Sequence, residues 1–310
     1  MRNAFAAAIT ELAAQDERVV LLSGDIGNRL FDKLKEQAPE RFYNCGVAEA
    51  NMVTVAAGMA LCGLRPFTYT ITPFTTLKCI EQIRIDVCYH RAPVVIVGTG
   101  SGLSYASLGP THHSCEDVAL LRAMPNMTVL CPADAAEARQ AVFAAHRLEG
   151  PVYIRLGKKG EPAVHASPPA FTVGEGITLR EGTDICLLAL GTMAAVGLEV
   201  ADLLQASGVS AQVLSMHTIK PFNKSLLQDV FSRFPLVAVA EEHGRGGLGS
   251  AVAEWMAEQW PRPTARLLAF GTPDAFLCEA GSQQYTRRRI GLDPESIAAK
   301  IAEAFSAIEG

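Results

Sequence analysis

The sequence lacks the features that mark membrane proteins, secreted proteins and nucleic-acid-binding proteins. No apolar run is long enough to span a bilayer, and no signal peptide precedes the first helical segment. The 32 acidic residues outnumber the 27 basic ones, and Arg287–Arg289 is the only dense basic cluster. A slightly negative chain without a longer basic run argues against a nucleic-acid partner. We therefore expect neither a membrane nor a nucleic acid as a partner.

The cysteines argue against a disulfide framework. The eight cysteines are scattered, form no Cys-x-x-Cys pair, and stand mostly in apolar stretches, as Cys62, Cys88 and Cys186 do. Cysteines of this kind are typical of small buried apolar residues in a reducing compartment. The sequence therefore predicts a cytoplasmic protein.

What the sequence does contain is an alternation of strand and helix patterns. Its 310 residues, 49% of them apolar, suit two domains with sizeable cores. Near-continuous apolar strands separated by helices indicate a mostly parallel sheet with helices on both faces. The first set of predicted strands is 19–23, 67–71, 93–98, 127–130 and 152–155, with helices at 52–61, 77–90, 116–123 and 135–148.

A second alternation follows a break at 157–173. This segment holds Lys158, Lys159 and three prolines, a composition typical of an extended linker. The strands predicted after it are 185–190, 211–215, 236–240 and 264–270, with helices at 193–205, 225–231, 249–260 and 294–305. We therefore expect an α/β chain of two domains, each a mostly parallel sheet with helices on both faces. The predicted bounds are 1–160 for the first domain, 161–178 for the linker and 179–310 for the second domain.

The most informative segment places one carboxylate at a strand-to-helix turn. An extended, mostly apolar stretch ends at Gly46, Glu49 follows, and an apolar helical segment begins at Met52. An ionised carboxylate beside a close-packed apolar surface is costly, so Glu49 is expected to hold a proton or to have a dedicated partner. On the local pattern alone, an acid that caps a helix N-terminus is the simpler interpretation.

A second segment, Leu108–Ser114, changes that balance. It reads Leu-Gly-Pro-Thr-His-His-Ser, and together the two segments resemble the pyrimidine-binding half of transketolase, a thiamine-diphosphate enzyme. The resemblance runs from about Val19 to the C-terminus. Its further landmarks are Ser23–Asp25, Pro125–Met127, Cys131–Asp134, His217–Pro221, Glu241–His243 and Gly246–Ser250.

The resemblance implies roles for three residues. Glu49 would hydrogen-bond N1′ of the cofactor's aminopyrimidine ring and so activate the cofactor for loss of its thiazolium C2 proton. Phe74 would pack on that ring, although an ordinary core position is the alternative for an aromatic residue. His112 would contact hydroxyl or carbonyl oxygens of the donor substrate and stabilise an oxyanion there.

Other matched positions would border the cofactor or the substrate. Asp25 would border the cofactor cleft, and Ile71 stands where many transketolases have another aromatic residue. Lys158 stands where relatives carry a phosphate-binding arginine, with a solvated linker lysine as the alternative. Arg29 is a second candidate for contact with an anion, and Arg155 is interpreted as a structural residue.

Two departures concern the substrate. Leu108 replaces an aspartate of ordinary transketolases, and Gly100 replaces a histidine that faces phosphate. We therefore expect a pocket that is less polar or differently shaped than one for pentose phosphates. His113 ranks below His112 as a site residue. In the second domain, His217 and the run Glu241–His243 are interpreted as structural or interface residues.

The diphosphate site of a complete transketolase has no counterpart in the sequence. Asp25 is followed by Ile26 rather than by a second glycine, no phosphate loop of the right form follows, and no carboxylate cluster predicts a metal site. The resemblance therefore implies a C-terminal subunit whose partner, a separate N-terminal subunit, holds the diphosphate and Mg²⁺ or Ca²⁺.

The implied assembly is α2β2, with self-association of this chain. The implied reaction is the transfer of a two-carbon ketol unit between small sugar substrates. A β-type subunit of a 2-oxo-acid dehydrogenase is the alternative enzyme, and a catalytically silent regulatory subunit is the alternative from another class.

Overall fold

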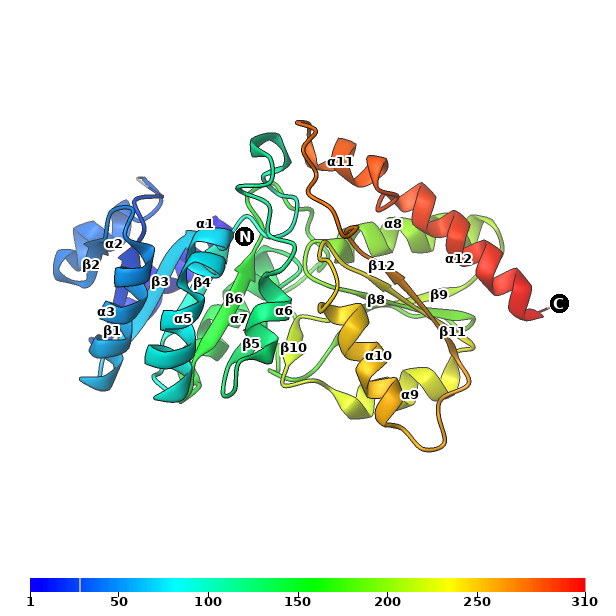
Figure 1. The fold of residues 1–310 in the computed structure, drawn as a ribbon, viewed down its shortest axis with the longest axis horizontal. Coiled ribbons are helices and arrows are strands. Elements are labelled where there is room, and N and C mark those ends of the chain that lie inside the picture. Colours follow the sequence, from blue (N-terminus) through cyan, green and yellow to red (C-terminus); the bar gives the residue numbers. More distant parts are fainter. Residues whose placement is uncertain (28, 310) are drawn as a thin grey trace.

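The structure is a computed structural model that describes residues 1–27 and 29–309. Two sheets lie next to each other and are covered by helices (Figure 1). The first has seven strands in the order β10-β5-β6-β4-β3-β1-β2, and the second has five in the order β12-β11-β8-β9-β7. Strands pair in parallel except at two edges, where β10 and β7 run antiparallel to their neighbours. The predicted fold class is confirmed.

The strands of the first sheet are β1 (Val19–Ser23), β2 (Phe42–Asn44), β3 (Arg65–Ile71), β4 (Val95–Thr99), β5 (Thr128–Leu130), β6 (Val152–Leu156) and β10 (Thr218–Lys220). Those of the second sheet are β7 (Ile177–Arg180), β8 (Ile185–Ala189), β9 (Ala211–Ser215), β11 (Leu236–Ala240) and β12 (Arg266–Phe270). The α-helices before the linker are α1 (Arg2–Gln15), α2 (Asp32–Gln37), α3 (Glu49–Leu61), α4 (Thr72–Thr75), α5 (Ile80–Gln82), α6 (Asp117–Ala123) and α7 (Ala135–Arg147). Those after it are α8 (Met193–Ala206), α9 (Lys224–Arg233), α10 (Leu248–Glu258), α11 (Gln283–Arg289) and α12 (Pro294–Glu309).

The first sheet is apolar on both faces, which is why its strands are near-continuous apolar runs. Successive side chains of a strand point to opposite faces. In β1, Val20 and Leu22 therefore pack in the core that contains α3 and α6. Val19 and Leu21 pack in the core that contains α1 and α7. This two-sided burial is typical of a parallel sheet between helical layers.

The two domains share part of their hydrophobic core. The core on the α3 face of the first sheet continues into residues of β8, β9, β11, α9 and α10. The opposite face of the second sheet is covered by α8 and α12. Within the described residues, no helix is both long enough and apolar enough to cross a membrane.

Two short strands, β10 and β7, were not predicted, and a third, β2, was predicted only as an extended stretch. β10 comes from the chain after the linker, yet it pairs with β5 and extends the first sheet, with Thr218 opposite Leu130. β7 begins at Ile177, inside the predicted linker, and pairs with β9. β2 is the first part of the extended stretch that ends at Gly46, and it pairs with β1. Such strands of three or four residues depend on a distant partner and leave little periodic signal.

The helical segment predicted over 77–90 is present, but its helix type changes along its length. A 3₁₀ turn (Leu77–Cys79) leads into α5, and a π-helix (Ile83–Tyr89) follows. Asp86 in the π-helix accepts a 2.6 Å hydrogen bond from the Thr54 hydroxyl of α3. The change of helix type breaks the 3.6-residue period, which sequence periodicity cannot reveal at this length.

The linker region is irregular but held in place by specific contacts. The imidazole Nε2 of His165 lies 2.7 Å from Glu137 Oε1 in α7. Glu137 is fully buried and its Oε2 also accepts hydrogen bonds from the Ala133 amide at 2.7 Å and the Ser215 hydroxyl at 3.1 Å. The linker thus contributes one partner of a buried hydrogen-bond network that joins the two domains.

The bond between His165 and Glu137 predicts a pH-dependent part of the stability. The hydrogen bond to Glu137 raises the pKa of His165 above 6.5 against the opposing effect of burial. A raised folded-state pKa stabilises the fold fully below the unfolded-state pKa, and this stabilisation is lost as the pH rises through the folded-state pKa. His165→Gln keeps a hydrogen-bond donor but does not titrate. Between pH 6 and pH 8.5, the free energy of unfolding should fall by about 1 kcal/mol more for the wild type than for His165→Gln, as measured by urea unfolding. Equal losses in both proteins would contradict the prediction.

Candidate active site

Several of the predicted site residues lie at the edge where parallel strands of the first sheet end. β1, β3, β4 and β6 run parallel, so the segments that follow them leave the sheet at the same edge. Gly24 follows β1, Ile71 ends β3, Gly100 follows β4 and Lys158 follows β6. Ligands of open α/β sheets bind at this edge.

Glu49 is the first residue of α3 and is buried, with 4% of its surface exposed. Its Oε2 accepts a 2.5 Å hydrogen bond from the ammonium of Lys78, which also donates to the Val47 carbonyl at 3.0 Å. The sequence predicted that this carboxylate would hold a proton or have a dedicated partner, and Lys78 is that partner. Lys78 itself was not predicted, because it lies outside α3 and only the tertiary structure brings it to Glu49.

The other side of Glu49 is closely packed. A Cβ atom on Gly24 would lie 2.9 Å from the Thr70 hydroxyl oxygen and 3.3 Å from Glu49 Cγ, so a side chain at position 24 would crowd both. The Thr70 hydroxyl is buried and has no hydrogen-bond partner among the described residues. Among the described residues, Lys78 bonds to Oε2 of the Glu49 carboxylate, and Oε1 has no hydrogen-bond partner. A buried hydroxyl and a carboxylate oxygen thus remain free for a polar ligand.

Phe74 and His112 come together in a cluster of rings. The ring centroids of Phe74 and His112 are 5.3 Å apart, and those of Tyr105 and His112 are 6.1 Å apart, both in edge-to-face geometry. Burial and the neighbouring His113 lower the pKa of His112. His112 is therefore a neutral imidazole at neutral pH, with Nδ1 2.9 Å from the Thr111 hydroxyl.

Cys79 links the ring cluster to the glutamate. Its thiol donates to the Phe74 carbonyl at 3.2 Å. Burial, together with the nearby Glu49 carboxylate, raises the pKa of Cys79 to about 12. The structure therefore brings Glu49, Phe74 and His112 into one region, as the resemblance implied.

Tyr105 fills the space that the glycine at position 100 leaves free. A Cβ on Gly100 would overlap the Tyr105 ring, and Gly100 has a φ of +84°. The ammonium of Lys158 lies over the Tyr105 ring, 4.6 Å from its centroid. Tyr105 thus contacts both His112 and Lys158, two predicted substrate residues. The sequence did not predict Tyr105, because a glycine can indicate that another group packs closely against the backbone but does not indicate which residue that is.

The remaining predicted residues are more dispersed. Asp25 is exposed, has a φ of +55°, and accepts a 3.0 Å hydrogen bond from the Asn44 amide. Ile71 is half-buried at the end of β3, and Leu108 is 51% exposed. Arg29 is exposed and lines a groove of ≈ 660 Å³ between α1 and α2, so the structure does not place it in the ring cluster.

Two residues that the sequence treated as structural or lower-ranked are buried. Arg155 forms a buried ion pair with Asp117 at 2.8 Å, in agreement with its structural interpretation. His113 is buried, and its Nε2 lies 3.4 Å from the Ala106 carbonyl oxygen. It does not take part in the ring contacts that His112 makes.

The run Glu241–His243 lies at the end of β11 and is buried. Glu241 accepts hydrogen bonds from the Leu248 and Gly249 amides at 2.7 and 2.8 Å, so it binds the N-terminus of α10. Burial raises the pKa of Glu241 to about 7, although these two amides act in the opposite direction. This contact agrees with the structural role expected for Glu241.

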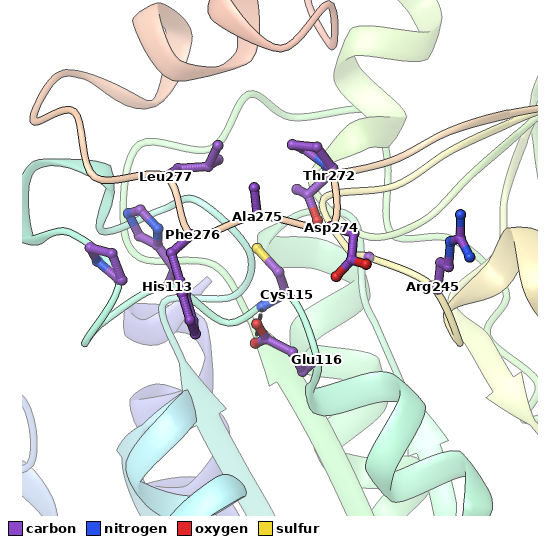
Figure 2. Close-up of a pocket in the computed structure, with 12 residues that line it drawn as sticks. His113, Cys115, Glu116, Arg245, Thr272, Asp274, Ala275, Phe276 and Leu277 are labelled. Carbon is purple, nitrogen blue, oxygen red and sulfur yellow. Dashed lines mark hydrogen bonds between the residues drawn. The ribbon is translucent and has the colours of Figure 1, made fainter.

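A separate cavity of ≈ 360 Å³ lies between the two domains (Figure 2). Figure 2 shows Cys115 and Glu116 on one side and the segment that carries Thr272, Asp274 and Phe276 on the other. None of the residues predicted to bind cofactor or substrate lines it. The cavity is therefore distinct from the region around Glu49.

The fold and the site together define a class of protein. Two α/β domains, with a buried glutamate and a ring cluster at the carboxyl edge of the first sheet, are the arrangement expected of a thiamine-diphosphate enzyme. Residues 1–161 match the transketolase pyrimidine-binding domain, and residues 174–297 match the transketolase C-terminal domain. The chain belongs to the transketolase family.

Several relatives are separate subunits of about the same length. The 6-deoxy-6-sulfo-D-fructose transketolase subunit SqwH of Clostridium sp. (strain MSTE9) is 36% identical over 299 residues, which cover 96% of this chain and 92% of the relative. A subunit of the apulose-4-phosphate transketolase of Phocaeicola vulgatus is 32% identical over 299 residues, covering 96% and 94%. A solved structure described as a split gene transketolase, inactive β4 tetramer, has a TM-score of 0.87 at 37% identity and covers 98% of this chain and 97% of its own.

The residues around Glu49 fit an aminopyrimidine ring. Such a ring offers nitrogen donors and acceptors along one edge, and the Glu49 carboxylate and the unpaired Thr70 hydroxyl provide matching polar atoms. Gly24 keeps the space beside them free of a side chain. Glu49 would hold the ring nitrogen, and Phe74 would pack against the ring face.

The ion pair between Lys78 and Glu49 predicts energetic coupling between the two residues. Lys78→Met leaves the buried carboxylate without its cation. Because the Lys78 side chain is 51% exposed and water screens the pair, we expect a loss of about 1 kcal/mol in the free energy of unfolding. Adding Glu49→Gln to Lys78→Met should recover part of that loss, since no buried charge then lacks a partner. Urea unfolding of the four proteins gives the coupling energy, and purely additive effects would contradict this account.

The contact between Gly100 and Tyr105 is tested by a pair of glycine substitutions. Gly100→Ala meets both a positive φ and the Tyr105 ring, whereas Gly109→Ala meets a φ of +76° in open space. We expect Gly109→Ala to lower the free energy of unfolding, measured by urea unfolding, by about 1 kcal/mol. Gly100→Ala should lower it by about 1–3 kcal/mol more than Gly109→Ala does. In a Tyr105→Ala background the excess should shrink. An equal cost for both glycines would show that the ring does not restrict position 100.

Proposed function

We propose that this chain is the C-terminal subunit of a two-subunit, thiamine-diphosphate-dependent transketolase. The enzyme transfers a two-carbon ketol unit between sugars. The observation that supports this most directly is the buried Glu49 at the start of α3, beside the unpaired Thr70 hydroxyl, in a chain of the transketolase family. Thiamine diphosphate supplies the electron sink for the reaction when it is bound.

The residues of this chain bind and orient the reacting groups. Glu49 would share a proton with the ring nitrogen, and its burial would keep water from competing for that hydrogen bond. Phe74 fixes the plane of the ring. His112 is neutral at neutral pH because its pKa is lowered, so it can donate one N–H to a substrate oxygen without adding a charge to the site.

Exposed apolar side chains close to Glu49 and on the loop that carries His112 support a site that a partner subunit completes. Val47 is 75% exposed, Leu77 42% and Leu108 51%. Apolar groups gathered on a surface favour contact with another protein. The described residues also contain no group of three or more His, Cys, Asp or Glu side chains that could hold a metal. We propose that an N-terminal subunit holds the diphosphate and its Mg²⁺ or Ca²⁺ in a cytoplasmic α2β2 assembly, in which copies of this chain also contact each other.

The position and charge of Lys158 favour a sugar substrate that carries a terminal anionic group. Its ammonium is held over the Tyr105 ring near His112, and a lysine binds phosphate as a point charge. Gly100 and the exposed Leu108 add no polar group there. Two relatives are named for a sulfo-sugar and a phosphorylated sugar. We propose phosphorylated sugars or similarly anionic sugars, and we do not expect ordinary pentose phosphates to be good substrates.

Calorimetry and one substitution test the proposal. Thiamine diphosphate titrated with magnesium into this chain alone should give no detectable binding, because the diphosphate and metal site lies on the partner. Adding the N-terminal subunit should restore binding. Glu49→Gln in the assembled enzyme should lower kcat by about 10²–10⁴-fold, while Glu81→Gln, an exposed carboxylate in α5, serves as the matched control.

The opposite results would separate the alternatives. Tight, magnesium-dependent binding to this chain alone would contradict the division of the site between subunits. Unchanged turnover in Glu49→Gln would instead identify this chain as a catalytically silent subunit.

A further inference from the structure

The loop that carries the substrate residues is closed at its base. We call residues 100–114 the His112 loop; it follows β4 and carries Tyr105, Leu108 and His112. At its base the Gly102 amide donates to the Ser114 carbonyl at 3.0 Å, and the Ser114 amide donates back to the Gly102 carbonyl at 2.9 Å. These two bonds close the loop, so its position depends on what holds this base.

A carboxylate of the second domain holds the base of the loop. Glu242 follows β11, is 1% exposed, and its Oε2 accepts a 3.1 Å hydrogen bond from the Leu103 amide. The backbone of Gly102 passes directly against it, because a Cβ on Gly102 would overlap the Glu242 side chain. Gly102 also has a φ of +55°, which glycine adopts readily. The glycine therefore lets the buried carboxylate reach the loop backbone.

Helix α11 holds Glu242 from the other side. Arg287 Nε donates to Glu242 Oε1 at 2.6 Å, and Gln283 Nε2 lies 2.9 and 3.0 Å from the two oxygens. Both carboxylate oxygens are therefore bonded and the buried charge has a cationic partner. Figure 1 shows α11 beside the loop that follows β4.

Arg155 holds the same base from the first domain. Its Nη2 donates to the Ser114 carbonyl at 2.8 Å and to the Glu242 carbonyl at 3.0 Å. The two strands of the loop base are thus fixed to one residue pair, Arg155 of β6 and Glu242 after β11. The sequence indicated a structural or interface role for Glu242, which agrees with its bond to the first domain, but it did not identify the loop that Glu242 contacts.

We propose that Glu242 is a positioning residue for the substrate site. It sets the position of the His112 loop, and through it the second domain sets where His112 and Tyr105 face the substrate. Glu242 acts through the Leu103 amide and does not touch the substrate. This inference rests on the proposed function, because it assigns a kinetic consequence to the placement of His112.

Glu242→Gln is the informative substitution, because it keeps the size of the side chain. One end of the carboxylate becomes an NH₂ group, which cannot accept from the Leu103 amide or from Arg287. The loop base should therefore loosen while the sheets keep their packing. Glu241→Gln is a matched control, since Glu241 is the adjacent buried carboxylate and binds the Leu248 and Gly249 amides instead of the loop.

Amide hydrogen exchange on the full chain tests the structural half of the proposal. Glu242→Gln should speed exchange in residues 103–113 by about 10-fold or more, because a hydrogen bond to a charged group is lost. Glu241→Gln should speed exchange near residues 248–250 and leave 103–113 unchanged. If Glu242→Gln does not fold, Arg287→Gln should give the same effect on the loop, with the exposed Arg289→Gln as its control. Unchanged exchange in 103–113 would overturn the proposal.

Kinetics of the assembled enzyme test the functional half. Glu242→Gln should lower kcat/KM for the sugar donor by about 10-fold or more, because the reaction rate falls steeply when the groups that contact the substrate are displaced. The Kd for thiamine diphosphate with magnesium should stay the same, which a general loss of folding would not allow. Faster loop exchange with unchanged kcat/KM would overturn the positioning role. A wild-type assembly without ketol transfer would overturn the proposed function instead, and the exchange data would still decide whether Glu242 holds the loop.

Discussion

The buried ion pair between Arg155 and Asp117 is the contact on which the arrangement of both domains depends. The two side chains are 2% and 0% exposed, and the Tyr153 hydroxyl also donates to Asp117 at 2.6 Å. Burial acts to raise the pKa of Asp117, but the Arg155 guanidinium holds it below its ordinary value. Removing one partner of such a pair typically costs about 3–5 kcal/mol, because the other charge stays buried. Arg155 Nη2 also donates to the carbonyls of Ser114 and Glu242, so one guanidinium joins β6, α6, the His112 loop and the end of β11.

Gly102 lets the loop backbone approach the Glu242 carboxylate, and a glycine in the second domain does the same for Glu241. A Cβ on Gly247 would overlap Glu241 Oε2, so no other residue could stand at that position without moving the carboxylate. The run Gly246–Ser250 therefore lets Glu241 reach the first amides of α10. The landmarks of the second domain thus have a packing explanation that does not need a ligand. Glu242 differs from Glu241 in its partners: its carboxylate meets the base of a loop in the first domain and Arg287, whereas Glu241 binds the N-terminus of a helix of its own domain.

Periodicity predicted the two-sheet fold because the main strands are apolar on both faces and the helices between them are regular. It failed where a partner far away in the sequence decides the structure, as for β10, which joins the first sheet by pairing with β5. The site divides in the same way. Glu49 stands in a local pattern at a strand-to-helix turn, so its position could be predicted. Lys78 reaches Glu49 from 29 residues away and only through the fold. Tyr105 lies in the same loop as Gly100, but the loop conformation that brings its ring to the glycine leaves no periodic pattern in the sequence.

Folding and ligand binding place different demands on this chain, and the structure separates them. The hydrophobic cores on both faces of both sheets are closed by the chain's own helices. In addition, the Glu49 charge is already compensated by Lys78. The fold therefore needs no cofactor to compensate the charge of the buried Glu49 carboxylate at the sheet edge. The exposed apolar side chains of Val47, near Glu49, and Leu108, in the His112 loop, are not part of these cores. Exposed apolar groups favour contact with another protein, and a partner subunit, as proposed above, would provide that contact without being needed for the stability of this chain.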